Sequence, residues 1–162
     1  MDLERLSVEE LVRLISPGSD VHKELRRRGI LRTKNTTGEL GEYFVVDYYN
    51  KTPGLPNLYL PGPGVQNVDV LSRNGERYSI KTTTSRTGTT GSFWNPESIE
   101  RDEKTFEYLI IVILEDDYSL DLLLELTWNQ FFEFKKFNSR MNNYNVSITK
   151  KLIESDNIIY ER

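Results

Sequence analysis

The apolar run YLIIVIL, which covers Tyr108–Leu114, places the strongest constraint on the fold. Seven uncharged residues in a row, rich in isoleucine and valine, are typical of a strand that is buried on both faces. Such a strand needs further strands beside it and a covering layer on each side. We therefore expect it to be the central strand of a single sheet that is flanked by helices.

The remaining sequence predicts helices and strands arranged around this central strand. Ser7 is expected to cap the first helix together with Glu10, and Gly29 to end the second. The expected helices are Ser7–Ile15, Asp20–Arg28, Thr36–Asn50, Asn95–Phe106 and Thr127–Phe137; the expected strands are 58–60, 67–72, 77–82, 119–126, 145–148 and 157–160. This order indicates an α+β (mixed α/β) protein, in which residues 1–35 are an N-terminal helical extension that packs on the core.

Composition limits the chemistry that the chain can perform. Its 162 residues include no cysteine and one histidine, His22, which excludes disulfides, thiol catalysis and cysteine-based zinc sites. A bound metal would have to be held by oxygen atoms, which favours magnesium, manganese or calcium.

The formal net charge is −4, but the basic residues are clustered. Six of them lie between His22 and Lys34 with a single acid, Glu24, and five lie between Lys135 and Lys151 with none. Such clusters are compatible with a basic surface for nucleic acid and equally with ordinary solvated surface. No apolar run approaches the ~18 residues of a membrane span, and the acidic N-terminus does not resemble a signal peptide. We therefore expect a cytoplasmic protein that does not bind membranes.

A β-hairpin is predicted within NVDVLSRNGERYSIKTTT, which begins at Asn67. A two-residue turn at Asn74-Gly75 would mix apolar and polar side chains on both faces. A three-residue turn with a left-handed Gly75 would instead pair Val70 with Tyr78, and Val68 with Ile80. The apolar pattern favours this second register, because a one-residue slip inverts every side chain. It also places Asp69, Ser79 and Lys81 together on one polar face.

An aspartate and a lysine on such a face can hold a divalent ion, orient a water molecule and stabilise negative charge. The alternative is a surface ion pair without function.

The order of Asp69 and then Ser79-Ile80-Lys81 after the turn resembles the motif of the PD-(D/E)xK nuclease superfamily. Within that superfamily the string is most similar to the small PvuII-type restriction endonucleases, and the resemblance covers residues 36–162. It implies a restriction-endonuclease-like central mixed sheet and hydrolysis of double-stranded DNA by a homodimer. It also implies a Mg²⁺ cofactor, for which Mn²⁺ can substitute.

The resemblance assigns Asp69 and the backbone carbonyl of Ile80 to the metal, and Lys81 to catalysis. Ser79 departs from the motif, because a metal-binding acid usually occupies this position. A displaced acid would have to come from another segment, either from Glu97 or Glu100 downstream, or from Glu39 or Glu42 upstream.

Glu42 is the preferred second acid, as metal ligand and catalytic residue, because it lies among apolar residues of a largely buried helix. A carboxylate there is costly unless it is paired or bound to metal. The alternative is that Glu42 pairs with an arginine or lies on a narrow solvent-exposed stripe.

Six residues are predicted to contact nucleic acid through phosphates or base edges: Arg32, Lys34, Arg77, Thr83, Arg86 and Lys150. Two alternatives to a nuclease remain open at this point. One is a catalytically inactive DNA-binding module on the same fold, and the other is an interaction protein whose hairpin matches the motif by chance.

Overall fold

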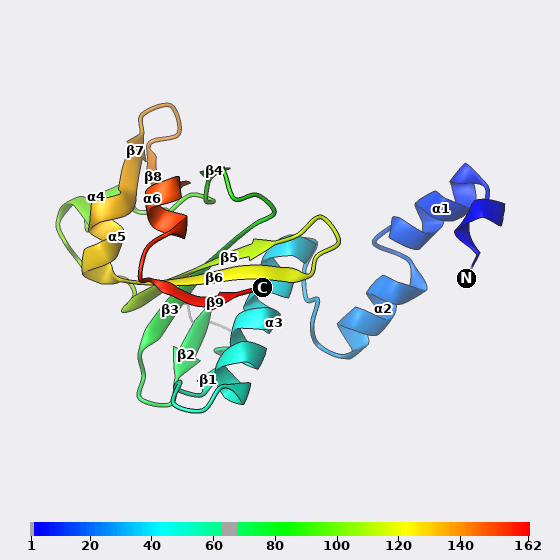
Figure 1. Cartoon of the computed structure of the whole chain (residues 1–162), viewed down its shortest axis with the longest axis horizontal. Coiled ribbons are helices and arrows are strands. Elements are labelled where there is room, and N and C mark those ends of the chain that lie inside the picture. Colours follow the sequence, from blue (N-terminus) through cyan, green and yellow to red (C-terminus); the bar gives the residue numbers. More distant parts are fainter. Residues whose placement is uncertain (1, 63–67) are drawn as a thin grey trace.

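The computed structural model describes residues 2–62 and 68–162. Its main sheet has six strands in the order β1-β2-β3-β5-β6-β9 (Figure 1). β3 and β5 are parallel, whereas the other neighbouring pairs are antiparallel. The strands are β1 (Leu58–Tyr59), β2 (Val70–Ser72), β3 (Arg77–Thr83), β5 (Tyr108–Leu114), β6 (Leu120–Thr127) and β9 (Ile158–Glu161). The predicted mixed α/β class, with helices flanking a mixed sheet, is confirmed.

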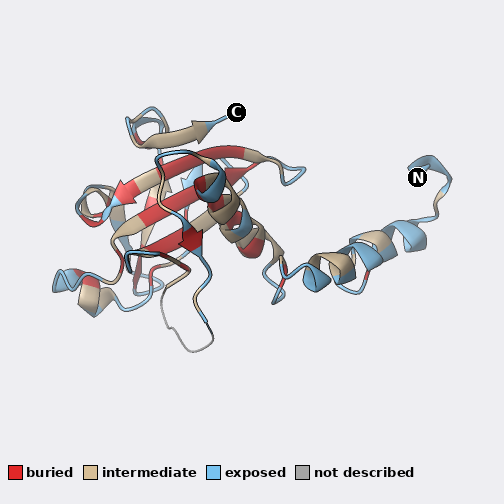
Figure 2. Cartoon of the chain, turned by 90° about the horizontal axis from the view of Figure 1, so that it is seen from below, coloured by how far each residue is buried: buried red, intermediate tan, exposed pale blue. Residues whose placement is uncertain are grey.

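Strand β5 is buried on both faces, as its sequence predicts (Figure 2). Ile110, Val112 and Leu114 pack with Val45 and Tyr49 of helix α3 (Thr36–Lys51) on one side of the sheet. The alternate residues Leu109, Ile111 and Ile113 belong to a second core, formed with aromatic residues on the other side. The period of two along β5 therefore divides the interior into two apolar layers.

Helix α3 lies unusually close to strand β3. A Cβ atom added to Gly41 would be 1.9 Å from the Oγ1 atom of Thr82. Glycine at position 41 therefore permits the helix backbone to approach the strand. This approach brings the carboxylates of α3 near the hairpin.

The second core is covered by a three-stranded sheet in the order β4-β8-β7 and by short helices. The strands are β4 (Gly88–Thr89), β7 (Lys135–Asn138) and β8 (Asn143–Ile148); the helices are α4 (Pro96–Glu100), α5 (Trp128–Phe134) and α6 (Lys150–Ile153).

Two helix boundaries predicted from the sequence are wrong in this region. The helix expected to reach Phe137 ends at Phe134, because residues 135–138 pair with β8 as an antiparallel strand. The helix expected from Asn95 to Phe106 ends at Glu100. Asp102 then adopts a left-handed φ of 54° and accepts a hydrogen bond from the Trp128 indole at 2.6 Å, which turns the chain.

The N-terminal segment forms η1 (Leu3–Arg5), α1 (Val8–Ile15) and α2 (Asp20–Arg27). The predicted Ser7–Glu10 capping box is present, and Gly29 is left-handed after α2. None of these helices contains a buried residue, and they extend away from the sheet (Figures 1 and 2) instead of packing on it. Most of their large apolar residues are exposed, among them Val8, Val12, Ile15 and Val21. Among the described residues no helix has the length and apolar character to cross a membrane.

Candidate functional site

The hairpin has the three-residue turn that the apolar pattern predicts. Val70 pairs with Tyr78, and the amide of Ser72 donates to the carbonyl of Glu76 at 2.9 Å. Gly75 has a left-handed φ of 84°. The ladder of β2 begins at Val70; Asn67, with which we expected the strand to begin, lies outside the described residues.

Asp69, Ser79 and Lys81 line one wall of a cavity of about 210 Å³, as expected for one polar face. The Oδ2 atom of Asp69 accepts hydrogen bonds from the Ile80 amide at 2.6 Å and from the Ser79 hydroxyl at 3.3 Å. Strand β3 therefore fixes the position of the carboxylate, and Ser79 acts as a donor to it.

Lys81 extends into this cavity, with its Nζ atom 4.8 Å from the centroid of the Phe93 ring. Burial lowers the pKa of its ammonium group below the ordinary value, and the negative charge of Asp69 partly opposes this effect. Lys81 has no ion-pair partner among residues 2–62 and 68–162. The ammonium group of Lys81 therefore releases its proton more readily than that of an ordinary lysine, and it shares the cavity with the carboxylate of Asp69.

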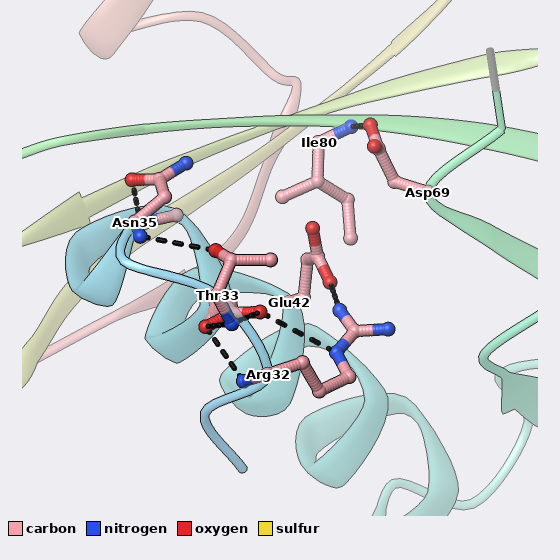
Figure 3. Close-up of polar contacts among 8 residues, drawn as sticks. Arg32, Thr33, Asn35, Glu42, Asp69 and Ile80 are labelled. Carbon is pink, nitrogen blue, oxygen red and sulfur yellow. Dashed lines mark hydrogen bonds and ion pairs between the residues drawn. The ribbon is translucent and has the colours of Figure 1, made fainter. Parts of the chain in front are cut away.

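Glu42 approaches the hairpin from the α3 side of β3. One of its oxygens accepts a hydrogen bond from the Arg32 guanidinium, and the other is directed towards the strand that carries Ile80 (Figure 3). Burial raises the pKa of Glu42, the charge of Asp69 raises it further, and Arg32 opposes both. The arginine partner considered as the alternative is therefore present, but Glu42 is also close enough to Asp69 for their charges to interact.

The other three candidate acids have other surroundings in the fold. Glu39 is 4% exposed, and its carboxylate accepts hydrogen bonds from the backbone amides of Arg32 at 2.8 Å and Thr33 at 2.9 Å. It holds the loop before α3 in place. Glu97 and Glu100 are exposed on α4. Neither of them lines the cavity of Asp69 and Lys81, and Glu42 lines a separate cavity with Arg32 and Glu39. Glu42 is preferred among the four candidates because its charge interacts with that of Asp69.

The donor atoms near Asp69 fit a magnesium ion that shares its coordination with a substrate. No group of three or more histidine, cysteine or acidic residues with metal-binding geometry occurs in the described part of the chain. Mg²⁺, however, is usually held by one or two carboxylates together with substrate phosphates and water molecules. Within the described residues, Asp69 Oδ1 and Glu42 Oε1 accept no hydrogen bond and can serve as ligands. The Ile80 amide points towards Asp69, and its carbonyl is expected on the same side of the strand.

Three of the six residues predicted to contact nucleic acid are arginines that form ion pairs with acids of this chain. Arg77 pairs with Glu107 at 2.8 Å, and Arg86 pairs with Asp121 at 2.7 Å and with Glu161 at 2.9 Å. Arg32 pairs with Glu42. Because these acids are distant in sequence, the local pattern around each arginine does not reveal the pairing. The arginine charges are largely neutralised within the fold.

The other three predicted contact residues remain accessible. Lys34 and Lys150 are exposed, and Thr83 lies partly exposed at the end of β3. The Lys150 ammonium has one distant ion pair, 3.7 Å from Glu154. These three residues therefore stay available to a ligand.

Sequence reasoning missed the opposite wall of the cavity, which consists of Ser92, Phe93, Trp94, Asn95, Ile99, Thr105 and Phe106. The amide of Phe93 donates to the carbonyl of Tyr144 at 2.7 Å, and this contact fixes the wall against β8. The available signal was the pair of aromatic residues directly before Asn95-Pro96. The loop of residues 83–94 follows the hairpin and was a candidate for nucleic-acid contact, but neither aromatic residue was among the predicted site residues.

Comparison of the sequence with protein-family models gives no match, and comparison with curated proteins also gives none. The function is therefore inferred from the geometry of the hairpin, the cavity and helix α3.

Proposed function

We propose that this protein is a Mg²⁺-dependent endonuclease of the restriction type, related to the PD-(D/E)xK superfamily, that hydrolyses double-stranded DNA as a homodimer. The observation that carries the proposal is the shared cavity of Asp69 and Lys81, in which the lysine has a lowered pKa. Perturbed pKa values of this kind, next to a specific charged partner, are typical of functional sites. Glu42 adds a second carboxylate beside Asp69.

Asp69, Glu42 and the Ile80 carbonyl are the groups that would hold the metal. Magnesium, when bound, polarises a phosphodiester and lowers the pKa of coordinated water. Lys81 donates hydrogen bonds to a phosphate oxygen in the cavity and balances the negative charge that develops at phosphorus. Its lowered pKa also makes release of a proton at Nζ easier than in an ordinary lysine.

A second candidate function is a DNA-binding module on the same fold that has lost catalysis. Ser79 favours it, because a serine occupies the position at which the motif usually carries a metal-binding acid, so that the proposed metal ligands include two carboxylates, Asp69 and Glu42.

Incubation with supercoiled plasmid DNA tests the two functions. We expect nicked and linear products with Mg²⁺ or Mn²⁺, and none when EDTA removes the metal. Salt-dependent DNA binding without cleavage under any of these conditions would favour the inactive module. Absence of both binding and cleavage would contradict both functions. The remaining alternative would then be an interaction protein whose hairpin matches the motif by chance.

Ser79→Asp is expected to lower the Mg²⁺ concentration needed for half-maximal cleavage severalfold. The new carboxylate would lie on the same polar face as Asp69, and metal affinity rises with the number of charged ligands. Without metal the variant should be less stable than wild type, because two like charges would face each other. The measurements are cleavage rates across a Mg²⁺ titration and melting temperatures with and without Mg²⁺.

Ser79→Ala is the matched control, since it removes the hydroxyl without adding charge. An unchanged Mg²⁺ requirement in Ser79→Asp, with the variant folded, would show that position 79 does not face the metal.

A further inference from the structure

Trp94 is a large aromatic side chain at the opening of the cavity that contains Asp69 and Lys81. Its relative exposure is 66%, whereas its neighbour Phe93 is buried at 5%. Tryptophan is highly buried on average, because its ring has the largest apolar surface of any side chain. An indole that remains open to solvent beside a lysine and a carboxylate is therefore suited to contact a ligand.

The backbone on both sides of Trp94 is held in place. Phe93 forms a β-bridge with Tyr144, and its ring packs against Phe131 at a centroid distance of 4.8 Å. Asn95 is left-handed, with φ 67° and ψ 60°, and Pro96 starts helix α4 directly after it. A ligand that contacts the indole therefore has little backbone to order, which favours binding.

We propose that Trp94 stacks on an unpaired nucleobase of the DNA strand whose phosphate lies between Asp69 and Lys81. This inference rests on the proposed nuclease function and specifies the form of the substrate. The ammonium of Lys81 attracts the phosphate, while the indole offers an apolar face of the kind on which bases stack. Bases inside a closed duplex are covered on both faces by their neighbours. The unpaired base is therefore either part of a single strand or extruded from a duplex.

Tryptophan fluorescence reports on this contact directly. Trp94 supplies the exposed signal, because the other tryptophan, Trp128, is 4% exposed and donates a hydrogen bond to Asp102. Wild type and Trp94→Phe are titrated in EDTA with three probes: a single-stranded oligothymidylate, a matched duplex and a duplex with one unpaired base. We expect the wild-type emission to fall on binding and the emission of Trp94→Phe to stay constant.

Binding is measured in parallel by the anisotropy of labelled DNA. Trp94→Ala is expected to weaken binding about 5- to 150-fold, the effect of losing stacking on one base. Trp94→Phe should retain most of the affinity, because phenylalanine also stacks. Tyr118→Ala, which removes an exposed aromatic side chain that does not line the cavity, should leave binding unchanged. Because Trp94 is exposed, these variants are expected to melt at the wild-type temperature.

The outcomes separate this inference from the proposed function. Quenching by the single strand and by the duplex with an unpaired base alone supports stacking on a base that is already unpaired. Quenching by the matched duplex as well supports extrusion of a base. Unchanged emission and an unchanged affinity of Trp94→Ala, while DNA binds and is cleaved, would overturn the role of Trp94 and leave the nuclease intact. Failure of all three DNAs to bind would overturn both.

Discussion

Lys81→Met is expected to abolish metal-dependent cleavage and, at the same time, to raise the stability of the protein at pH 7. Methionine is similar in length and apolar, so it can occupy the same space beside Phe93 without the charge. Loss of one preorganised donor to a transition state typically lowers the rate by about 10²- to 10³-fold. A loss of at least this size in the plasmid assay would agree with the assignment of Lys81.

The gain in stability follows from the sign of the pKa shift. The pKa of Lys81 is below its ordinary value of 10.5 in the folded protein, so the fold disfavours the charged form. The destabilisation is complete below the folded pKa and disappears as the pH rises beyond about 10.5, where Lys81 is neutral in both the folded and the unfolded state. The advantage of Lys81→Met in melting temperature should therefore be largest below the folded pKa of Lys81 and should shrink as the pH rises from there beyond 10.5.

Lys104→Met is the matched control, because Lys104 is exposed, does not line the cavity and has no ion-pair partner in the described part of the chain. It should change neither the melting temperature nor the cleavage rate at saturating DNA. Wild-type cleavage by Lys81→Met would refute the catalytic role. A lower melting temperature at every pH would refute the argument from burial.

The features that could be predicted from sequence are those set by short-range periodicity. The alternation of apolar residues along the hairpin is sufficient to define its register, and with it the shared face of Asp69, Ser79 and Lys81. The run at Tyr108–Leu114 likewise indicates burial on both faces. Each of these patterns is complete within one or two neighbouring strands, so no distant contact is needed to interpret it.

The features that could not be predicted depend on contacts between distant segments. Arg86 follows β3 and meets Asp121 of β6 and Glu161 of β9, two strands that come much later in the chain. The composition around Arg86 suggests a free cation. The cavity wall at Trp94 similarly depends on pairing with β8, which lies about 50 residues later in the chain. The charge or aromatic character of a residue therefore indicates what its side chain can bind. It does not indicate whether another segment of the same chain already binds that side chain in the fold.

Glu42→Gln is expected to remove the stabilisation of the protein by Mg²⁺ and to abolish cleavage, while raising the stability of the metal-free protein at pH 7. The amide keeps the shape of the side chain and can still accept a hydrogen bond from Arg32. It cannot supply the negative charge that a divalent cation requires. Melting temperatures measured with and without Mg²⁺ should differ for wild type but not for the variant.

The pH dependence of stability separates this explanation from a general loss of packing. Burial, and then Asp69, raise the pKa of Glu42 above its ordinary value of 4.5 in the fold. Below that value Glu42 is protonated in both the folded and unfolded states, so its ionisation does not lower the stability of the protein. As the pH rises through the folded pKa, the unfolded state loses its proton first, and stability falls. Glu42→Gln lacks this loss of stability. Its stability relative to wild type should therefore begin to rise above about pH 4.5 and should increase until the pH has passed the folded pKa of Glu42.

Cleavage by the wild type should respond to pH in the opposite direction. Metal binding needs the ionised form of Glu42, so activity should rise across the same range in which metal-free stability falls. Glu97→Gln provides the matched control, since Glu97 is an exposed glutamate, whereas Glu42 is partly buried and its charge interacts with Asp69. If Glu97→Gln abolished cleavage and Glu42→Gln did not, the displaced acid would come from α4. If both variants cleaved as wild type, Ser79 would mark a site that works with the carboxylate of Asp69 alone.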